Sequence, residues 1–228
     1  MYEIIVMNFT ALGIGLLISA ASTAEPAFTV KYDRVAPSTN IAEPIRKLLG
    51  GDALVVRNDQ AEVVMTIWFR TVIPVHATPE QLKNGLTYRE IREGELVGVI
   101  QFPRVFTDFR RQDIPAGVYT LRFAIQPDIG DHAGTAPHPD FCLMSPVASD
   151  TVADLVEKKE LIRRSSEVNE GKHPAVLLLF PHHAKDEATK LVDKGDGVWV
   201  VTTRRAVTTG EAAGTLGFAI TVAGMRKS

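Results

Sequence analysis

Short runs of apolar residues, separated by turn residues, extend along the chain from Phe28 onward. The runs are rich in Val, Ile, Phe, Tyr and Thr, and several alternate between apolar and polar positions, which is typical of β-strands. Turn signals such as Asn58-Asp59 and the Gly-Asp-Gly sequence at 195–197 lie between them. We therefore expect strands at 28–35, 53–57, 62–70, 86–92, 95–102, 117–126, 175–180, 197–203 and 214–223.

The clearest alternation lies in the sixth of these runs. Its apolar positions are Tyr119, Leu121 and Phe123, and the polar residues Thr120 and Arg122 stand between them. This pattern predicts a strand with one face in the core and one wetter face. On that basis Leu121→Ala should cost about 2–5 kcal/mol. Arg122→Ala should cost much less if the guanidinium is exposed.

Nine short strands without helices between them argue against a parallel α/β sheet, because such a sheet needs a crossover connection between its strands. They favour antiparallel sheets instead. We therefore predict a mostly β fold, an antiparallel β-sandwich or jelly-roll-like structure, formed as a single domain by residues 25–228. One amphipathic helix is expected to accompany the strands.

The expected helix spans 151–168. Thr151 and Asp154 have the spacing of a capping box, and Glu160 stands four residues before Arg164 in the favourable orientation for an ion pair. The apolar residues expected on one helical face are Val152, Leu155, Val156 and Ile162. We expect this helix to lie across an edge or an open end of the strand layers.

A Pro-Ala-Gly corner leads into the run at 117–126. The sequence 114–124 reads Ile-Pro-Ala-Gly-Val-Tyr-Thr-Leu-Arg-Phe-Ala. Proline presets one turn dihedral and glycine supplies the permissive one. The run resembles a motif of uncharacterised exported bacterial β-sandwich domains, in which a Pro-Ala-Gly corner enters a strand with Tyr-x-Leu. Residues 105–109 are similar to the strand that precedes the corner there. The resemblance implies an architecture and no activity.

The N-terminal segment 1–24 has the pattern of a signal peptide. Its residues from Phe9 to Ala21 are mostly apolar, and the small residues Ser22-Thr23-Ala24 follow. The segment departs from the usual pattern because no Lys or Arg precedes the apolar part. A buried strand or helix and an uncleaved anchor are the alternatives, although the apolar part is short for a membrane span. We expect an exported protein, periplasmic or extracellular, with no stable membrane span after cleavage.

The charge balance and the cysteine count exclude several classes of protein. The chain has 25 basic and 27 acidic residues, which argues against a basic surface for nucleic acid. Its single cysteine, Cys142, excludes an intrachain disulfide framework. The sequence also lacks the Gly-x-Ser-x-Gly, P-loop, dinucleotide-binding and His-Glu-x-x-His motifs. We therefore expect a non-catalytic binding or structural module whose partner is an unknown ligand or a component of the cell envelope.

The segment 127–146 holds the densest group of chemically active side chains. His132, His138, Cys142 and Met144 supply two imidazoles, a thiol and a thioether, a set of ligands that suits copper. The order of these residues differs from that of a cupredoxin, in which the histidine follows the cysteine. The length of the segment and its prolines also make it the expected functional surface, whatever the function is.

Three other interpretations of this segment are open. It can be a structural loop that leads Cys142 into a strand as a small core residue. Asp128 and Asp131 suggest calcium, although the usual ladder of calcium ligands is absent. A hydrolase of an unfamiliar class would use Asp131 and Asp140 with one of the two histidines as acid and base.

Overall fold

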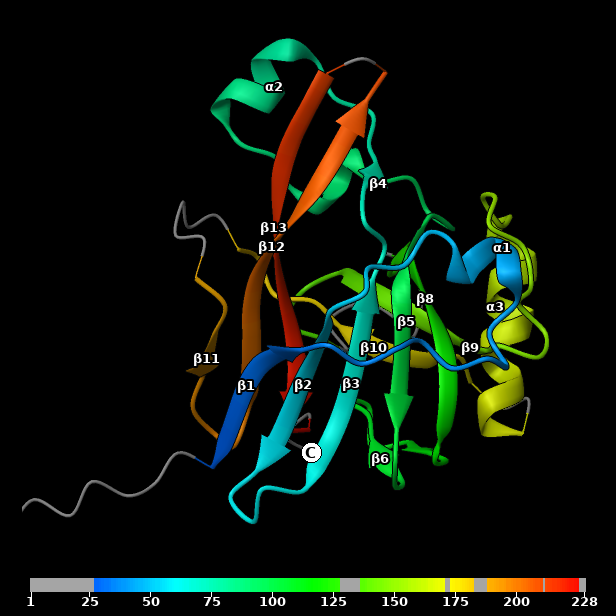
Figure 1. Ribbon diagram of the computed structural model, residues 1–228, viewed down its shortest axis with the longest axis vertical. Helices are drawn as coiled ribbons and strands as arrows, with labels where there is room; N and C mark the ends of the chain where they lie inside the picture. Colours follow the sequence, from blue (N-terminus) through cyan, green and yellow to red (C-terminus); the bar gives the residue numbers. More distant parts are fainter. Residues whose placement is uncertain (1–26, 128–135, 171–172, 183–187, 211, 226–228) are drawn as a thin grey trace, which may run out of the picture.

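Seven antiparallel strands form the larger sheet (Figure 1). The computed structural model describes residues 27–127, 136–170, 173–182, 188–210 and 212–225, so the expected signal peptide lies outside the described residues. In spatial order, the strands of this sheet are β1 (Phe28–Asp33), β2 (Ala53–Asn58), β3 (Val63–Phe69), β5 (Leu96–Phe102), β8 (Gly117–Ile125), β9 (Asp140–Pro146) and β10 (Ala175–Leu178).

A smaller sheet packs against the larger one. It contains β11 (Lys190–Asp193), β12 (Trp199–Thr209) and β13 (Ala212–Ala223), with β4 (Ile73–Pro74) paired in parallel to β12. The two sheets meet through a bridge between Leu179 and Ile220 and through a hydrogen bond between the hydroxyls of Tyr32 and Thr203. The mostly β, sandwich-like fold predicted from the sequence is therefore confirmed.

The hydrophobic core lies between the two sheets, and further clusters cover the outer face of the larger sheet. The main cluster joins inward-facing residues such as Leu121 and Phe123 to Phe218 of β13. On the outer face, a second cluster surrounds Trp68 beside α1 (Glu43–Arg46). A third cluster surrounds Leu161 of α3 (Lys158–Ser166). The larger sheet is therefore buried on both faces over much of its area.

This double burial corrects the prediction for the strand at 117–126. Tyr119, Leu121 and Phe123 face the core as expected. Thr120 and Arg122 are nevertheless fully buried, because residues on the outer face cover the positions that the alternation assigned to solvent. The expectation of an exposed Arg122 head is therefore wrong.

The expected strands agree with the structure except at 86–92. Here Thr87 caps a 3₁₀ turn, Tyr88–Glu90, by accepting a hydrogen bond from the Arg89 amide. The Glu90 carboxylate accepts one in return from the Thr87 amide. Tyr88 and Ile91 are still buried, which explains the strand-like pattern. Strands β4, β7 (Asp113–Ile114) and β11 were not expected from the sequence. Strand β6 (Phe106–Thr107), which pairs with β7, lies in the segment 105–109 that resembles a strand, and β9 agrees with the interpretation in which Cys142 enters a strand.

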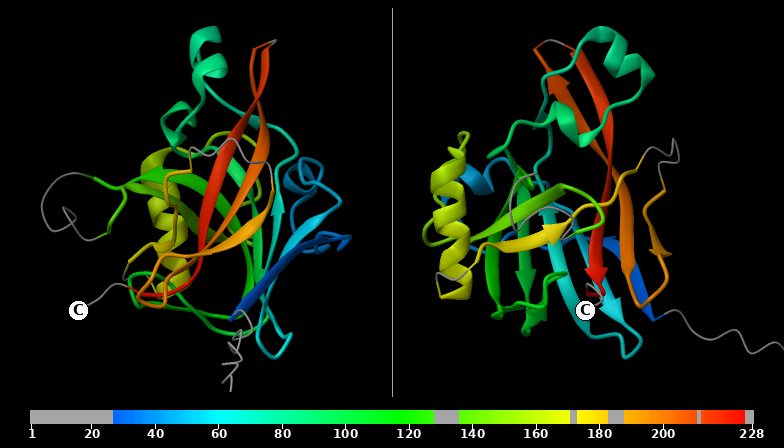
Figure 2. Two further views of the ribbon diagram at one scale, coloured as in Figure 1. Left: turned by 90° about the vertical axis from the view of Figure 1, so that its left-hand side faces the viewer. Right: turned by 180° about the vertical axis from the view of Figure 1, so that it is seen from behind.

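The helix expected at 151–168 begins later than predicted. Helix α3 starts at Lys158 and continues into a 3₁₀ turn that ends at Asn169, and its N-cap is Glu157 rather than Thr151. The predicted pair of Glu160 and Arg164 is confirmed. Helix α3 packs along β9 (Figure 2), whereas α2 (Pro79–Asn84) lies near the turn between β12 and β13. No helix among the described residues has the length and apolar character needed to span a membrane.

The Pro-Ala-Gly corner is held by a hydrogen bond from Tyr119, which follows it in the chain. The Tyr119 hydroxyl donates a hydrogen bond of 2.8 Å to the Pro115 carbonyl oxygen. The same ring lies so close to Gly117 that a β-carbon there would come within 2.9 Å of the Tyr119 hydroxyl. Gly117 does not have a positive φ, so the glycine serves this close approach of the ring rather than a left-handed backbone.

Candidate functional site

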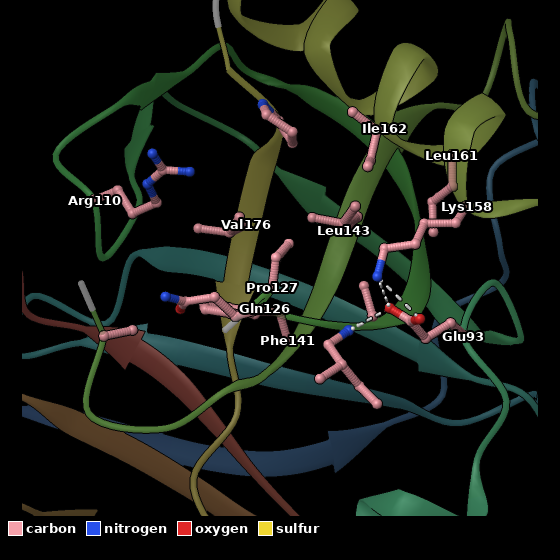
Figure 3. Close-up of a pocket in the computed structure, with 14 residues that line it drawn as sticks. Glu93, Arg110, Gln126, Pro127, Phe141, Leu143, Lys158, Leu161, Ile162 and Val176 are labelled. Carbon is pink, nitrogen blue, oxygen red and sulfur yellow. Dashed lines mark hydrogen bonds and ion pairs between the residues drawn. The ribbon is translucent and has the colours of Figure 1, made fainter. Parts of the chain in front are cut away.

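A cavity of about 240 Å³ lies between α3 and the outer face of strands β8, β9 and β10 (Figure 3). Its walls are mostly apolar, and they come from six parts of the chain: the turn before β5, the turn between β6 and β7, the end of β8, β9, α3 and β10. The lining residues are Glu93, Arg110, Ala124, Ile125, Gln126, Pro127, Ala136, Phe141, Leu143, Lys158, Leu161, Ile162, Pro174 and Val176. The segment expected to form the functional surface, 127–146, contributes four of them.

Strand alternation explains how β9 serves both the cavity and the core. Phe141 and Leu143 belong to the outer cluster and line the cavity, whereas Cys142 and Met144 belong to the main core. Side chains at successive positions of a strand point to opposite faces. Cys142 and Met144 therefore share one face of β9, and that face is the closed interior between the sheets.

One side of the cavity carries a paired carboxylate. Glu93 accepts a hydrogen bond of 2.9 Å from the Ile125 amide, and the Lys158 ammonium lies 3.0 Å from the same carboxylate. Lys158 is the first residue of α3, so this ion pair joins the helix to the turn before β5. The carboxylate of Glu93 is thus neutralised within the wall of the cavity.

Arg110 lies at the opposite side of the cavity from the Glu93–Lys158 pair, with Val176 and Leu143 between them (Figure 3). Arg110 belongs to the turn that joins β6 to β7. Beneath this turn is the buried carboxylate of Asp108, which accepts a hydrogen bond of 2.8 Å from the Arg110 amide.

Asp108 also fastens the turn to the sheet. Its carboxylate accepts hydrogen bonds from the Gln112 amide, the Gln112 side chain and the Val176 amide. Burial raises the pKa of Asp108, and these hydrogen bonds oppose that effect. The backbone that carries Arg110 is therefore held in place against β10.

Helix α3 is positioned by a buried ionic network centred on Arg122. The guanidinium donates to both carboxylate oxygens of Asp150, at 2.7 and 3.0 Å. It also donates to the carbonyl oxygens of Gly94, Val152 and Asp154. These contacts use all five N–H donors of the arginine. They also explain why residues 151–157 are not helical, since two of their carbonyl groups point at Arg122 instead of along a helix axis.

The network continues into α3. The Asp150 carboxylate accepts further hydrogen bonds from the Thr120 hydroxyl at 2.6 Å and from Arg164 at 2.9 Å. Arg164 in turn pairs with Glu160 at 2.7 Å. Because Arg164 and Glu160 belong to α3, this chain of contacts fixes the helix over β8 and β9. The position of α3, which forms one wall of the cavity, therefore depends on Arg122.

The structure does not bring together the residues predicted to bind copper. His132 lies outside the described residues. His138 packs edge-on against Phe180, which borders the outer cluster, whereas Cys142 and Met144 are on the inner face. Within the described ranges, no group of three or more His, Cys, Asp or Glu side chains is arranged to hold a metal ion. Asp128 and Asp131, the suggested calcium ligands, also lie outside these ranges, and the copper site stays a prediction.

The surroundings of Cys142 make its thiol unreactive. Only 1 % of the residue is exposed, and burial raises the pKa of the thiol far above its usual value. A thiolate, which copper ligation requires, is therefore strongly disfavoured in the folded protein.

We accordingly expect Cys142 in the native protein to resist a water-soluble disulfide reagent at pH 8 and to react fully in guanidinium chloride. The measurement is the release of the reagent's coloured thiolate over time, with the denatured protein as the control for complete reaction. Rapid modification of the native protein would contradict this placement of Cys142.

Another pocket, of about 210 Å³, contains Asp140, one of the carboxylates considered for a hydrolase. Asp140 lies 3.7 Å from Arg89, and His182 lines the same pocket. Burial raises the pKa of Asp140, and the nearby charges of Arg89 and His138 partly offset this increase. The other proposed carboxylate, Asp131, is outside the described residues, so the hydrolase also stays a prediction.

Comparison with known proteins identifies no relative. No family model matches the chain, and neither the curated proteins nor the solved structures include a match. The function must therefore be argued from the geometry of this molecule alone. The sequence pointed to the 127–146 segment but not to the cavity, because the cavity walls come from segments that are distant along the chain. The alternation of Phe141 and Leu143 with Cys142 and Met144 was the available signal for one wall.

Proposed function

We propose that this protein is an exported, non-catalytic module that binds a small, mostly apolar molecule in the cavity beneath α3. The observation that carries the proposal is the concave, mostly apolar lining with polar groups confined to its sides. Such a combination is typical of binding sites for small molecules. Export is supported by the apolar N-terminal segment followed by small residues.

The size and polarity of the cavity limit what it can hold. Its volume of about 240 Å³ is just below the range of about 300–1,000 Å³ that is common for ligand sites. It therefore suits a short alkyl chain or a single aromatic ring better than a nucleotide or an oligosaccharide. Burial of the apolar part of such a ligand provides about 25 cal/mol for each Å² removed from water.

The ionisable groups of the cavity support binding rather than catalysis. Glu93 already accepts hydrogen bonds from the Ile125 amide and from Lys158. The Glu93 carboxylate is therefore already held by a hydrogen bond and an ion pair within the wall of the cavity. The remaining ionisable residues, Lys158 and Arg110, are cations. None of these groups is arranged as a base beside a nucleophile.

The proposal is tested by titrating purified protein with 1-octanol in a calorimeter and comparing the result with that for Ala124→Leu. Ala124 lines the cavity from β8, and a leucine there fills space without removing a contact. We expect saturable binding to the unmodified protein and affinity at least tenfold weaker for the variant.

Ala206→Leu is the matched control, because Ala206 is exposed on β12 and does not line the cavity. This control should bind 1-octanol as the unmodified protein does. If Ala124→Leu does not fold, Ile162→Asp provides the same test from the exposed side of α3. Absence of saturable binding, or equal binding by the cavity variant and the control, would refute the proposal.

A further inference from the structure

The cation at one side of the cavity indicates the chemical class of the ligand. Arg110 lines the cavity, and among the described residues its guanidinium makes no ion pair or hydrogen bond. The nearby Asp108 carboxylate is occupied by amide donors from its own turn and from β10. Lys158 differs from Arg110, because its charge is matched by Glu93. The cavity therefore carries one unmatched positive charge.

We propose that the ligand is a short-chain amphiphile with one carboxylate group, whose apolar chain fills the cavity and whose carboxylate binds Arg110. This inference rests on the proposed function and names the class of ligand for the same site. The planar guanidinium offers paired N–H donors that match the two oxygens of a carboxylate. A single negative charge also balances the single unmatched cation.

The arrangement of the site orients such a ligand in one direction only. At the other side of the cavity, Lys158 already pairs with Glu93, so that side offers a carboxylate no unmatched cation. Leu143 and Val176 separate that side from Arg110 (Figure 3). The apolar chain consequently extends over these two residues toward Leu161, and the head group remains at Arg110.

The experiment compares octanoate with 1-octanol, which has a chain of the same length and no charge. Calorimetric titrations at pH 7 are made with the unmodified protein, with Arg110→Gln and with Arg111→Gln. Arg111 provides a matched control, since it lies in the same turn and does not line the cavity. We expect Arg110→Gln to weaken octanoate binding about tenfold and to change 1-octanol binding less than twofold.

Arg111→Gln should change the affinity for octanoate less than threefold. Octanoate binding to the unmodified protein should also weaken as salt is raised, whereas 1-octanol binding should not. If 1-octanol binds but Arg110→Gln leaves octanoate affinity unchanged, the carboxylate inference fails and the proposed function stands. An equal loss with Arg111→Gln would overturn the assignment to Arg110. If neither compound binds, both proposals fail.

Discussion

Replacing Arg122 by methionine is expected to destabilise the protein by about 3–5 kcal/mol, as is usual when one partner of a buried ion pair is removed. Methionine fills part of the space but leaves the Asp150 carboxylate buried with Thr120 and Arg164 as its remaining partners. The carbonyl groups of Val152 and Asp154 also lose the donor that Arg122 supplies, and that of Gly94 keeps only the Val156 amide. Chemical denaturation monitored by circular dichroism measures the change in the free energy of unfolding.

Two further variants test whether this loss comes from the network. Arg163→Ala removes an exposed arginine of α3 that pairs with Glu160 and Glu167, and it should cost less than about 1 kcal/mol. Leu121→Ala, which opens a cavity in the core, should cost about 2–5 kcal/mol. Losses of similar size for Arg122 and Leu121 are thus expected, since both faces of β8 are buried. A cost below about 1 kcal/mol for Arg122→Met would contradict the role given to the network.

Gly94→Ala is expected to destabilise the protein by at least about 3 kcal/mol, because backbone strain and lost hydrogen bonds add together. Gly94 has a φ of +88°, and a β-carbon there would lie 1.9 Å from the Val156 carbonyl oxygen. The substitution must therefore push Val156 away from the sheet. The carbonyl oxygen of Gly94 also accepts a hydrogen bond from Arg122, so the same movement disturbs the network.

Gly197→Ala separates the steric effect from the cost of a left-handed backbone. Gly197 has a similar φ of +76°, but no atom lies within 4 Å of the position its β-carbon would take. Strain alone should cost this variant about 1–2 kcal/mol. Thermal unfolding of the two variants under identical conditions provides the comparison. Equal losses of stability in the two variants would show that the close approach of Gly94 to Val156 adds nothing to the cost of Gly94→Ala.

Much of the fold could be predicted from local patterns, and the errors have identifiable physical causes. Strands β2 and β5 each contain two Val residues among other apolar residues, so their composition and their structure agree. Strand β9 was expected only in the interpretation that leads Cys142 into a strand, because prolines and a histidine precede it and its central residues include Cys142 and Met144, which are weak strand signals. The late start of α3 could not be predicted from the local sequence. It depends on Arg122, which is distant along the chain and donates to the Val152 and Asp154 carbonyl oxygens before the helix.

The candidate site was less predictable than the fold. Cys142 and His138 were expected to lie together because they are close in sequence. Strand alternation instead directs Cys142 into the core, while His138 packs against Phe180. Arg110 was not predicted as a site residue, because a single arginine in a turn forms no recognisable sequence pattern. Its importance arises only when the β6–β7 turn, β10 and α3 meet around one cavity.

The most direct test of a ligand site beneath α3 is an NMR titration of octanoate into protein with ¹³C-labelled methyl groups. We expect intermolecular nuclear Overhauser effects between the octanoate chain and the methyl groups of Leu143, Leu161 and Val176, all of which line the cavity. No such effects at saturating octanoate, or effects confined to methyl groups elsewhere on the protein, would contradict this account.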